Sequence, residues 1–254
     1  MIRSQSLDIA LSCSRSLEVT SMLSLADIIL VIGVYVYVFA VIAAATALQR
    51  KLKLHPRATR QMIHIFAGDA MLVLPLFSAW WYPFLLPLGL AIVVALGLTT
   101  RGSAFRRVMV DESGHSKLHA LGPLYYVISI GALVPLTWGV KAVGMATVMV
   151  MAWGDGAAAA LAPRIQGRHR YPFGDRSLEG SLIMLLFAFL GAALAWTLGS
   201  LTGAPPVPLV KGLGLALAGA AVGTVAEAFS VGALKPFDNF TVPLASALAM
   251  ILLL

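Results

Sequence analysis

The segment MVMAWGDGAAAALAPR, residues 149–164, decides the fold class of this chain. It is apolar enough to cross a bilayer, yet it carries one carboxylate, Asp155, in its middle. An ionisable side chain inside a membrane span is energetically expensive and is by default a candidate functional residue. The segment therefore predicts a transmembrane helix with a functional acid.

The composition of the whole chain extends this prediction. Of its 254 residues, 59% are hydrophobic and 11% are charged, and the mean hydropathy is +0.90. Soluble domains are about half apolar and about one quarter charged. We therefore expect an all-α, polytopic transmembrane bundle in a single domain, residues 25–254, after a polar and flexible segment, residues 1–24. The single cysteine, Cys13, excludes a disulfide framework and a thiolate metal site.

Apolar stretches place the individual membrane spans. A helix needs about 17 to 25 apolar residues to cross the hydrocarbon core. Trp80, Trp81 and Tyr82 are typical of an interfacial aromatic belt between two such spans. About eight spans are predicted, near residues 25–48, 62–77, 83–99, 121–138, 141–162, 180–199, 210–231 and 240–254.

Basic residues orient these spans. The loops 49–61, 100–119, 163–179 and 232–239 alternate along the chain and hold 14 of the 18 Lys and Arg residues. Because basic loops favour the cytoplasmic side, we expect these four loops in the cytoplasm and both termini outside. This topology explains the net charge of +7, and the sequence offers no soluble basic domain that would bind nucleic acid.

Four acidic or amide side chains are predicted near the cytoplasmic ends of their spans. Asp155 lies about 20 Å into a span that begins at residue 141, at 1.5 Å per residue. Glu227 lies late in its span, and Asp238 and Asn239 open the last one. Mg²⁺ takes carboxylate oxygens and usually shares nucleotide phosphates, so all four are predicted metal ligands and the three acids are predicted catalytic groups. The alternatives are an ion pair of Asp155 with an arginine and a helix cap at Asp238.

Glycine and arginine residues near Asp155 are predicted to bind nucleotide phosphates. Gly154 and Gly156 would let a phosphate approach the backbone closely. In the loop that follows, guanidinium groups suit phosphate oxygens, glycines free backbone N–H groups for anions, and a helix N-terminus favours an anion. A plain cytoplasmic loop with Ser177 as a helix cap is the alternative. The predicted residues of this loop are Arg164, Gly167, Arg168, Arg176, Ser177, Glu179, Gly180 and Ser181.

Arg60 and His64 complete the predicted nucleotide site. Because they are four residues apart on a predicted helix, they share one face and would clamp a phosphate at the membrane surface. The alternative is that both residues anchor the helix at the interface.

Five short motifs follow one another in a specific order. They are Arg-x-x-x-His at 60–64, Gly-Pro-Leu-Tyr-Tyr at 122–126, Gly-Asp-Gly-Ala-Ala at 154–158, Arg-Ser-x-Glu-Gly-Ser at 176–181, and Glu227 followed by Asp-Asn-x-x-x-Pro at 238–243. From about residue 57 to 245 the chain thus resembles the polyprenol kinase family, which includes dolichol kinase, phytol kinase and CTP-dependent diacylglycerol kinase. It departs from the family pattern at Gln61 and Arg176, where lysine is frequent, and at Ala162, where glycine is expected.

The resemblance implies an integral membrane enzyme that transfers the γ-phosphate of a nucleotide, typically CTP rather than ATP, to a lipid alcohol such as phytol, geranylgeraniol, dolichol or diacylglycerol. It also implies that Arg60, Asp155 and the 176–181 motif are essential. Phosphoryl transfer depends on positioning and electrostatics, so the arginines would neutralise the transferred group and Asp155 or Asp238 would be the base. The alternatives are a CDP-lipid cytidylyltransferase, which attacks the α-phosphate, and a transporter, whose site would lie near the membrane midplane.

Overall fold

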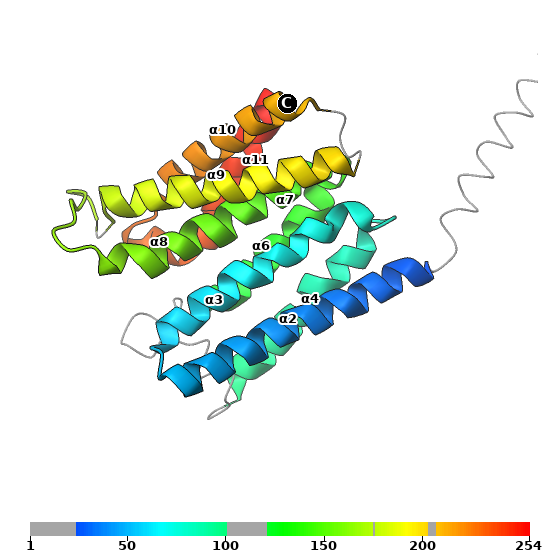
Figure 1. Cartoon of the computed structure of the whole chain (residues 1–254), viewed down its shortest axis with the longest axis horizontal. Coiled ribbons are helices and arrows are strands. Elements are labelled where there is room, and N and C mark those ends of the chain that lie inside the picture. Colours follow the sequence, from blue (N-terminus) through cyan, green and yellow to red (C-terminus); the bar gives the residue numbers. More distant parts are fainter. Residues whose placement is uncertain (1–23, 101–120, 175, 203–206) are drawn as a thin grey trace, which may run out of the picture.

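The prediction of an all-α bundle is confirmed. Within the described residues the chain is helical and contains no strand, with one isolated bridge between Arg170 and Ser177 (Figure 1). Of the segment expected to be flexible, residues 1–24, only Ser24 is described, and the basic loop 100–119 is described only at Thr100. The structure is a computed structural model that describes residues 24–100, 121–174, 176–202 and 207–254.

Several of the α-helices are joined by short segments of 3₁₀ or π geometry. The α-helices are α2 (Leu25–Leu52), α3 (Pro56–Gly68), α4 (Trp81–Thr99), α6 (Gly122–Leu136), α7 (Lys141–Met149), α8 (Gly156–Leu161), α9 (Leu178–Leu201), α10 (Leu209–Ala228) and α11 (Asp238–Leu253). Four short 3₁₀ helices and one π-helix join them: η1 (Asp69–Leu76), η3 (Trp138–Val140), η5 (Ala162–Arg164), η6 (Gly232–Phe237), and the π-helix η4 (Val150–Asp155).

The predicted number of spans requires a correction. Five helices of the described residues, not eight, are long and apolar enough to cross a membrane by length and composition. The apolar stretch predicted near 62–77 is divided between α3 and η1, and the apolar helices at 81–97 and 122–136 are shorter than a full span. The five spanning helices are Leu25–Leu52, Trp138–Arg164, Leu178–Leu201, Leu209–Ala228 and Leu234–Leu253.

Short-range chemistry sets the ends of several helices. The Ser24 hydroxyl accepts a hydrogen bond from the Asp27 backbone N–H at the start of α2, and Lys53 ends that helix in the left-handed region with φ of 51°. The Ser177 hydroxyl accepts from the Gly180 N–H at 3.2 Å, so Ser177 is the N-cap of α9, as the alternative interpretation of this residue expected. These caps fix where the loops around the site begin.

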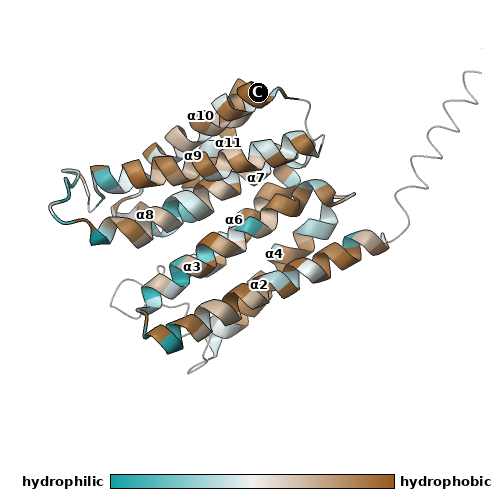
Figure 2. Ribbon diagram, in the orientation of Figure 1, coloured by the Kyte–Doolittle hydropathy of each residue, from teal (hydrophilic) through white to brown (hydrophobic). Residues whose placement is uncertain are grey.

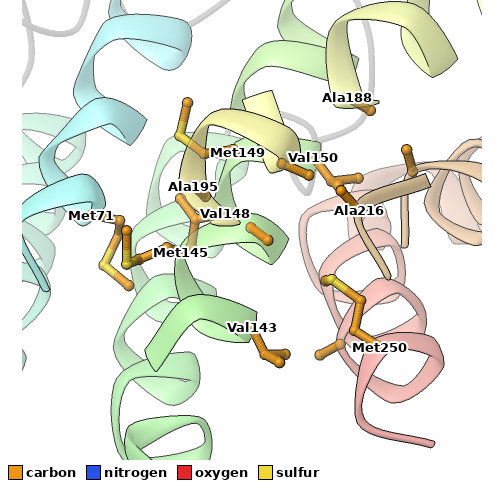
Figure 3. Close-up of a cluster of buried hydrophobic side chains, with 14 of the residues drawn as sticks. Met71, Val143, Met145, Val148, Met149, Val150, Ala188, Ala195, Ala216 and Met250 are labelled. Carbon is orange, nitrogen blue, oxygen red and sulfur yellow. The ribbon is translucent and has the colours of Figure 1, made fainter. Parts of the chain in front are cut away.

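The core surrounds α7, which runs through the middle of the bundle. Every residue of α7 from Ala142 to Met149 is buried, and α7 contacts α9, α11 and η1. Figure 3 shows its side chains among residues of the neighbouring helices, including Met71, Ala195 and Met250. Small residues on α9 let α9 and α7 approach closely, as is common between membrane helices. The helix that carries Asp155 is therefore held firmly by its neighbours.

Polar residues gather at one end of the bundle. Figure 2 shows hydrophilic residues where α2 ends, where α3 begins and where α8 leads towards α9. We call this the basic end; it holds the described connecting residues 53–55, 165–174, 176–177 and 229–237. The opposite end holds the start of α2, the turn 77–80 and the C-terminus (Figure 1). The described parts of three of the four predicted basic loops therefore lie at one end, and their cytoplasmic orientation stays a prediction.

Candidate functional site

A π-helical turn carries Asp155 at the basic end. The turn is η4, which interrupts the helical run from Lys141 to Leu161 and ends at Asp155. Such turns are rare and are found frequently at functional sites. The His64 Nε2 atom of α3 lies 3.2 Å from the Met151 carbonyl oxygen and 3.7 Å from Asp155 Oδ2. Because a carbonyl oxygen only accepts, Nε2 carries the proton in this contact. The sequence pattern gave no sign of this turn.

Two aromatic side chains hold α3 and η1 in place, Tyr126 from α6 and Trp153 from η4. The Tyr126 hydroxyl donates to the His64 carbonyl oxygen at 2.9 Å, and the two rings lie 4.2 Å apart. The Trp153 indole N–H donates to Asp69 Oδ1 at 2.7 Å. The sequence analysis did not assign Tyr126 or Trp153 to the site, although Tyr126 belongs to the Gly-Pro-Leu-Tyr-Tyr motif. Both residues orient the helix segment that presents His64 to Asp155.

The two glycines beside Asp155 serve helix packing. A side chain on Gly154 would collide with Ala188 and Met184 of α9, with a Cβ–Cβ distance of 2.9 Å to Ala188. A side chain on Gly156 would collide with α3 at Ile65 and His64. Both glycines are buried. This packing accounts for the small size of both residues, and their contact with a phosphate stays a prediction.

Arg176 joins three segments at the basic end. Its Nη1 atom lies 2.5 Å from Glu227 Oε1 at the end of α10, and its Nη2 atom lies 3.4 Å from Asp238 Oδ2 at the start of α11. The Asp238 carboxylate also accepts from the Asn239 backbone N–H at 2.8 Å. Glu227 is almost fully buried, with 4% of its surface exposed. Glu227 therefore acts as a counter-ion of Arg176 in this structure.

The predicted metal ligands are only partly brought together. Within the described ranges, no three or more His, Cys, Asp or Glu side chains are grouped so that they could hold a metal ion. Asp155, Asp238 and Asn239 nevertheless line one cavity, whereas Glu227 lines a smaller neighbouring pocket. Mg²⁺ usually binds through one or two carboxylates together with waters and substrate phosphates. The residues present therefore fit a Mg²⁺ site completed by waters and substrate phosphates better than a site in which the protein supplies every ligand.

The cavity has a volume of about 530 Å³ and a polar mouth at the basic end. Ligand sites commonly have volumes of about 300–1,000 Å³. The polar side chains of the mouth are Arg57, Arg60, Gln61, His64, Asp155, Arg176, Lys235, Asp238 and Asn239. The predicted residues Arg60, His64 and Asp155 thus line the same cavity, although Asp155 comes from η4 and the other two from α3.

A smaller pocket of about 110 Å³ adjoins this mouth and shares Arg176 with it. Its other polar side chains are Arg168, Ser177, Ser181 and Glu227. Gly180 and Ser181 of the first turn of α9 line this pocket, so the positive end of the helix dipole lies beside it. Four of the predicted phosphate-binding loop residues besides Arg176 therefore line this pocket: Arg168, Ser177, Gly180 and Ser181.

The remaining predicted loop residues hold the loop in shape. The Glu179 carboxylate accepts from the His169 backbone N–H at 3.0 Å and lies 2.6 Å from His169 Nδ1. Arg164 donates to the Ala160 carbonyl oxygen, and Gly167 turns the chain with φ of +67°. None of Arg164, Gly167 and Glu179 lines either pocket. These contacts stabilise the loop conformation, and the predicted nucleotide contact of the three residues stays a prediction.

Comparison with known proteins identifies the family. The chain is 37% identical over 220 residues to a phytol kinase of Synechocystis, with 84% of this chain and 86% of the relative covered. The chain belongs to the phytol kinase family. It is 29% identical to a probable chloroplastic phytol kinase of Triticum aestivum, covering 96% of this chain and 83% of the relative, and 27% identical to phytol kinase 1 of Arabidopsis thaliana, covering 83% and 71%.

Family membership confirms the resemblance drawn from the five motifs and makes the chain a phosphotransferase, as predicted. No family model and no solved structure matches the chain. The spanning helices make this phytol kinase family member an integral membrane protein.

Proposed function

We propose that this chain is a Mg²⁺-dependent kinase that transfers the γ-phosphate of CTP to the hydroxyl of a prenol such as phytol. One observation carries the proposal: Asp155, Asp238 and Arg176 meet where a phosphate-sized basic pocket joins a larger cavity. Relatives named phytol kinase support a prenol as the acceptor. ATP is the less favoured donor, by the resemblance to CTP-dependent kinases.

The nucleotide phosphates fit the smaller pocket and its junction with the cavity. Arg168 and the first turn of α9 would bind phosphate oxygens. Arg176 would neutralise charge on the transferred group, and Arg60 would contribute from the far side of the mouth. Mg²⁺, held by Asp155 and Asp238 with Asn239 nearby, would supply electrostatic stabilisation to the phosphate oxygens.

The acceptor hydroxyl fits the cavity side of Asp155. Its oxygen forms the new bond to the γ-phosphorus while the bond to the β–γ bridging oxygen breaks, and the nucleoside diphosphate leaves with that electron pair. The hydroxyl proton passes to a carboxylate. We assign this base to the Asp155 carboxylate oxygen that would not bind Mg²⁺, because Asp238 is engaged by Arg176 and by the Asn239 N–H. His64 would hold the Asp155 carboxylate in position.

Orientation in the membrane follows from the same proposal. Nucleotides are present in the cytoplasm, and the basic loops favour that side. We therefore propose that the basic end is cytoplasmic and that both termini are external. Cysteine labelling in intact cells tests this: a cysteine at position 168 stays unlabelled by an impermeant reagent, whereas labelling there reverses the orientation.

The reaction type is tested by the position of an isotope. Purified protein in detergent receives geranylgeraniol or phytol, Mg²⁺, and CTP labelled at either the γ- or the α-phosphate. We expect label in the lipid from the γ-position only, higher turnover with CTP than with ATP, and loss of turnover in the presence of a chelator. Label from the α-position with a lipid phosphate as the required acceptor would establish the cytidylyltransferase alternative instead.

A further inference from the structure

The large cavity changes character along its length. All of its charged side chains lie at the mouth, on the parts of α3, α8 and α11 at or near the basic end and in the residues flanking them. Deeper in the bundle the described lining becomes apolar, and it is built by the facing sides of α2, α3, α4 and α6. A polar mouth with an apolar interior fits an amphipathic ligand whose polar head stays at the mouth.

Regular helical spacing produces the apolar part. Val34, Val38 and Ile42 line it from α2, each one turn from the next. Leu86, Leu90 and Val94 do the same on α4. At 1.5 Å per residue, the lining of α4 from Pro83 to Val94 extends for about 16 Å. The apolar part is therefore a long groove along the bundle and not a rounded chamber.

The depth of this groove can be measured on α2. Ala45 packs with Ile63, the residue beside His64, so Ala45 marks the level of the mouth. Val38 and Val34 then lie about 10 Å and about 16 Å deeper, at 1.5 Å per residue. Phe77 and Tyr82 are buried and pack with Val34, which closes the groove at the opposite end of the bundle.

One side of the groove opens between α2 and α4. Phe39 of α2 and Val93 of α4 line the cavity, and 46% and 38% of their surfaces are exposed. Apolar side chains exposed in this way are compatible with contact to lipid tails. A lipid alcohol would reach the groove from the bilayer through this side.

We propose that the groove between α2 and α4 binds the prenyl chain of the acceptor, and that Val34 and Val38 determine how long a chain it accepts. This inference rests on the proposed function, because it places the hydroxyl beside Asp155 at the mouth. The chain lies extended along the bundle, and its far end reaches the level of Val34. Prenols that are too long for the groove are excluded by the buried residues Phe77 and Tyr82.

The test is a series of phenylalanine substitutions on one helix. Turnover is measured with geraniol, farnesol and geranylgeraniol, which contain two, three and four isoprene units. Val34→Phe lowers the ratio of geranylgeraniol to geraniol turnover by at least about tenfold, the size expected when a pocket loses room for one or more methylene groups. Val38→Phe, one turn nearer the mouth, lowers the ratio of farnesol to geraniol turnover as well.

Val36→Phe is the matched control. Val36 lies on the same helix but is 63% exposed, and it does not line the cavity. Its turnover ratios remain those of the unmodified protein. Unchanged ratios in Val34→Phe and Val38→Phe, with geraniol turnover retained, overturn the groove assignment and leave the kinase reaction intact. A protein that phosphorylates no prenol overturns the proposed function instead.

A binding experiment on the unmodified protein tests the same proposal without any substitution, so its result does not depend on whether the variants fold. A geranylgeraniol analogue with a photoreactive group at its far end is cross-linked, and the labelled peptide is identified by mass spectrometry. We expect label on α2 or α4 around Val34 and Pro83, in competition with unlabelled geranylgeraniol. Label confined to the outer faces of α9, α10 or α11 contradicts the proposal, whether or not turnover is observed.

Discussion

The two halves of the bundle differ in how completely they are packed. In the spanning helix Trp138–Arg164, which contains α7 and η4, 72% of the most apolar segment is buried inside the bundle. This helix contacts α9, α10 and α11 on one side (Figure 1). The corresponding figure for α2, in the other half, is 17%. The acid Asp155 belongs to the packed half, whereas most of the cavity lining belongs to the open half. Under the proposed function, the more buried half would position the reacting groups and the less buried half would receive the lipid.

The largest expected effect is at the packed side of the site. Asp155→Asn keeps the size of the side chain but removes the base, so turnover falls by about 10²–10⁴-fold, the usual contribution of general base catalysis. The phosphoryl-transfer assay with labelled nucleotide measures this loss. Thermal unfolding in detergent shows whether the variant is folded. Near-normal turnover in a folded Asp155→Asn protein would remove Asp155 from the mechanism.

The second prediction separates charge balance from catalysis at Arg176. Arg176→Ala leaves the Glu227 carboxylate buried beside an empty position, and breaking a buried ion pair typically destabilises a protein by about 3–5 kcal/mol. The double variant Arg176→Ala with Glu227→Gln recovers most of that stability, because the buried charge is gone. It does not recover turnover, since the positive group at the phosphate pocket is still missing. Unfolding temperature and turnover are measured on both variants.

Recovery of turnover in the double variant would show that Arg176 acts only through Glu227. The charge-conserving Arg176→Lys is the control, because lysine keeps a positive charge near both carboxylates. It is expected to be intermediate in turnover, since lysine cannot reproduce the two-pronged geometry of the guanidinium group.

The third prediction tests packing in the two halves directly. Ala188 on α9 is fully buried against the packed half, so Ala188→Leu overfills the core and destabilises the protein by about 1–3 kcal/mol. Ala67 on α3 lines the cavity, so Ala67→Leu has room and leaves the unfolding temperature nearly unchanged. Equal destabilisation by the two substitutions would mean that the halves do not differ in packing.

The comparison also explains what the sequence could predict. Hydropathy and the basic loops are properties of many residues together, and they predicted the all-α membrane fold and the polar end correctly. The motifs predicted the family. Asp155 could be proposed as a site residue because a charge inside an apolar segment stands out without any structure. Arg60 and His64 could be proposed from their spacing on one helix face, and the functional roles of all three residues stay predictions.

Features that depend on three-dimensional neighbours were not predictable in the same way. The π-helical turn before Asp155 changes the helical register, and the packing of Gly154 and Gly156 depends on which helices lie beside them. The pairing of Arg176 with Glu227 joins residues 51 positions apart, so spacing could not reveal it. The count of eight spans was wrong because apolar composition does not show where a helix breaks, as it does between α3 and η1.

The smallest expected effect concerns a second buried acid, at the opposite end from the site. Asp27 is 2% exposed, and its carboxylate accepts from the Ser78 backbone N–H at 2.9 Å and from the Ser78 hydroxyl at 2.5 Å. Nearby, Lys141 donates to the Phe77 carbonyl oxygen at 2.9 Å. These contacts fasten α2 and the turn 77–80 to one another and hold the start of α7 beside them.

Asp27→Asn is therefore expected to lower stability by about 1 kcal/mol, the size of one net hydrogen bond, while turnover with geranylgeraniol stays unchanged. The measurement pairs unfolding temperature with the phosphoryl-transfer assay, using the same amide substitution as in Asp155→Asn. Because the two changes are chemically identical, their different outcomes isolate position in the bundle as the cause. A loss of turnover in Asp27→Asn as large as that in Asp155→Asn would contradict this prediction. It would mean that the reaction depends equally on an acid at each end of the bundle, so the effect of Asp155→Asn would not identify Asp155 as the base.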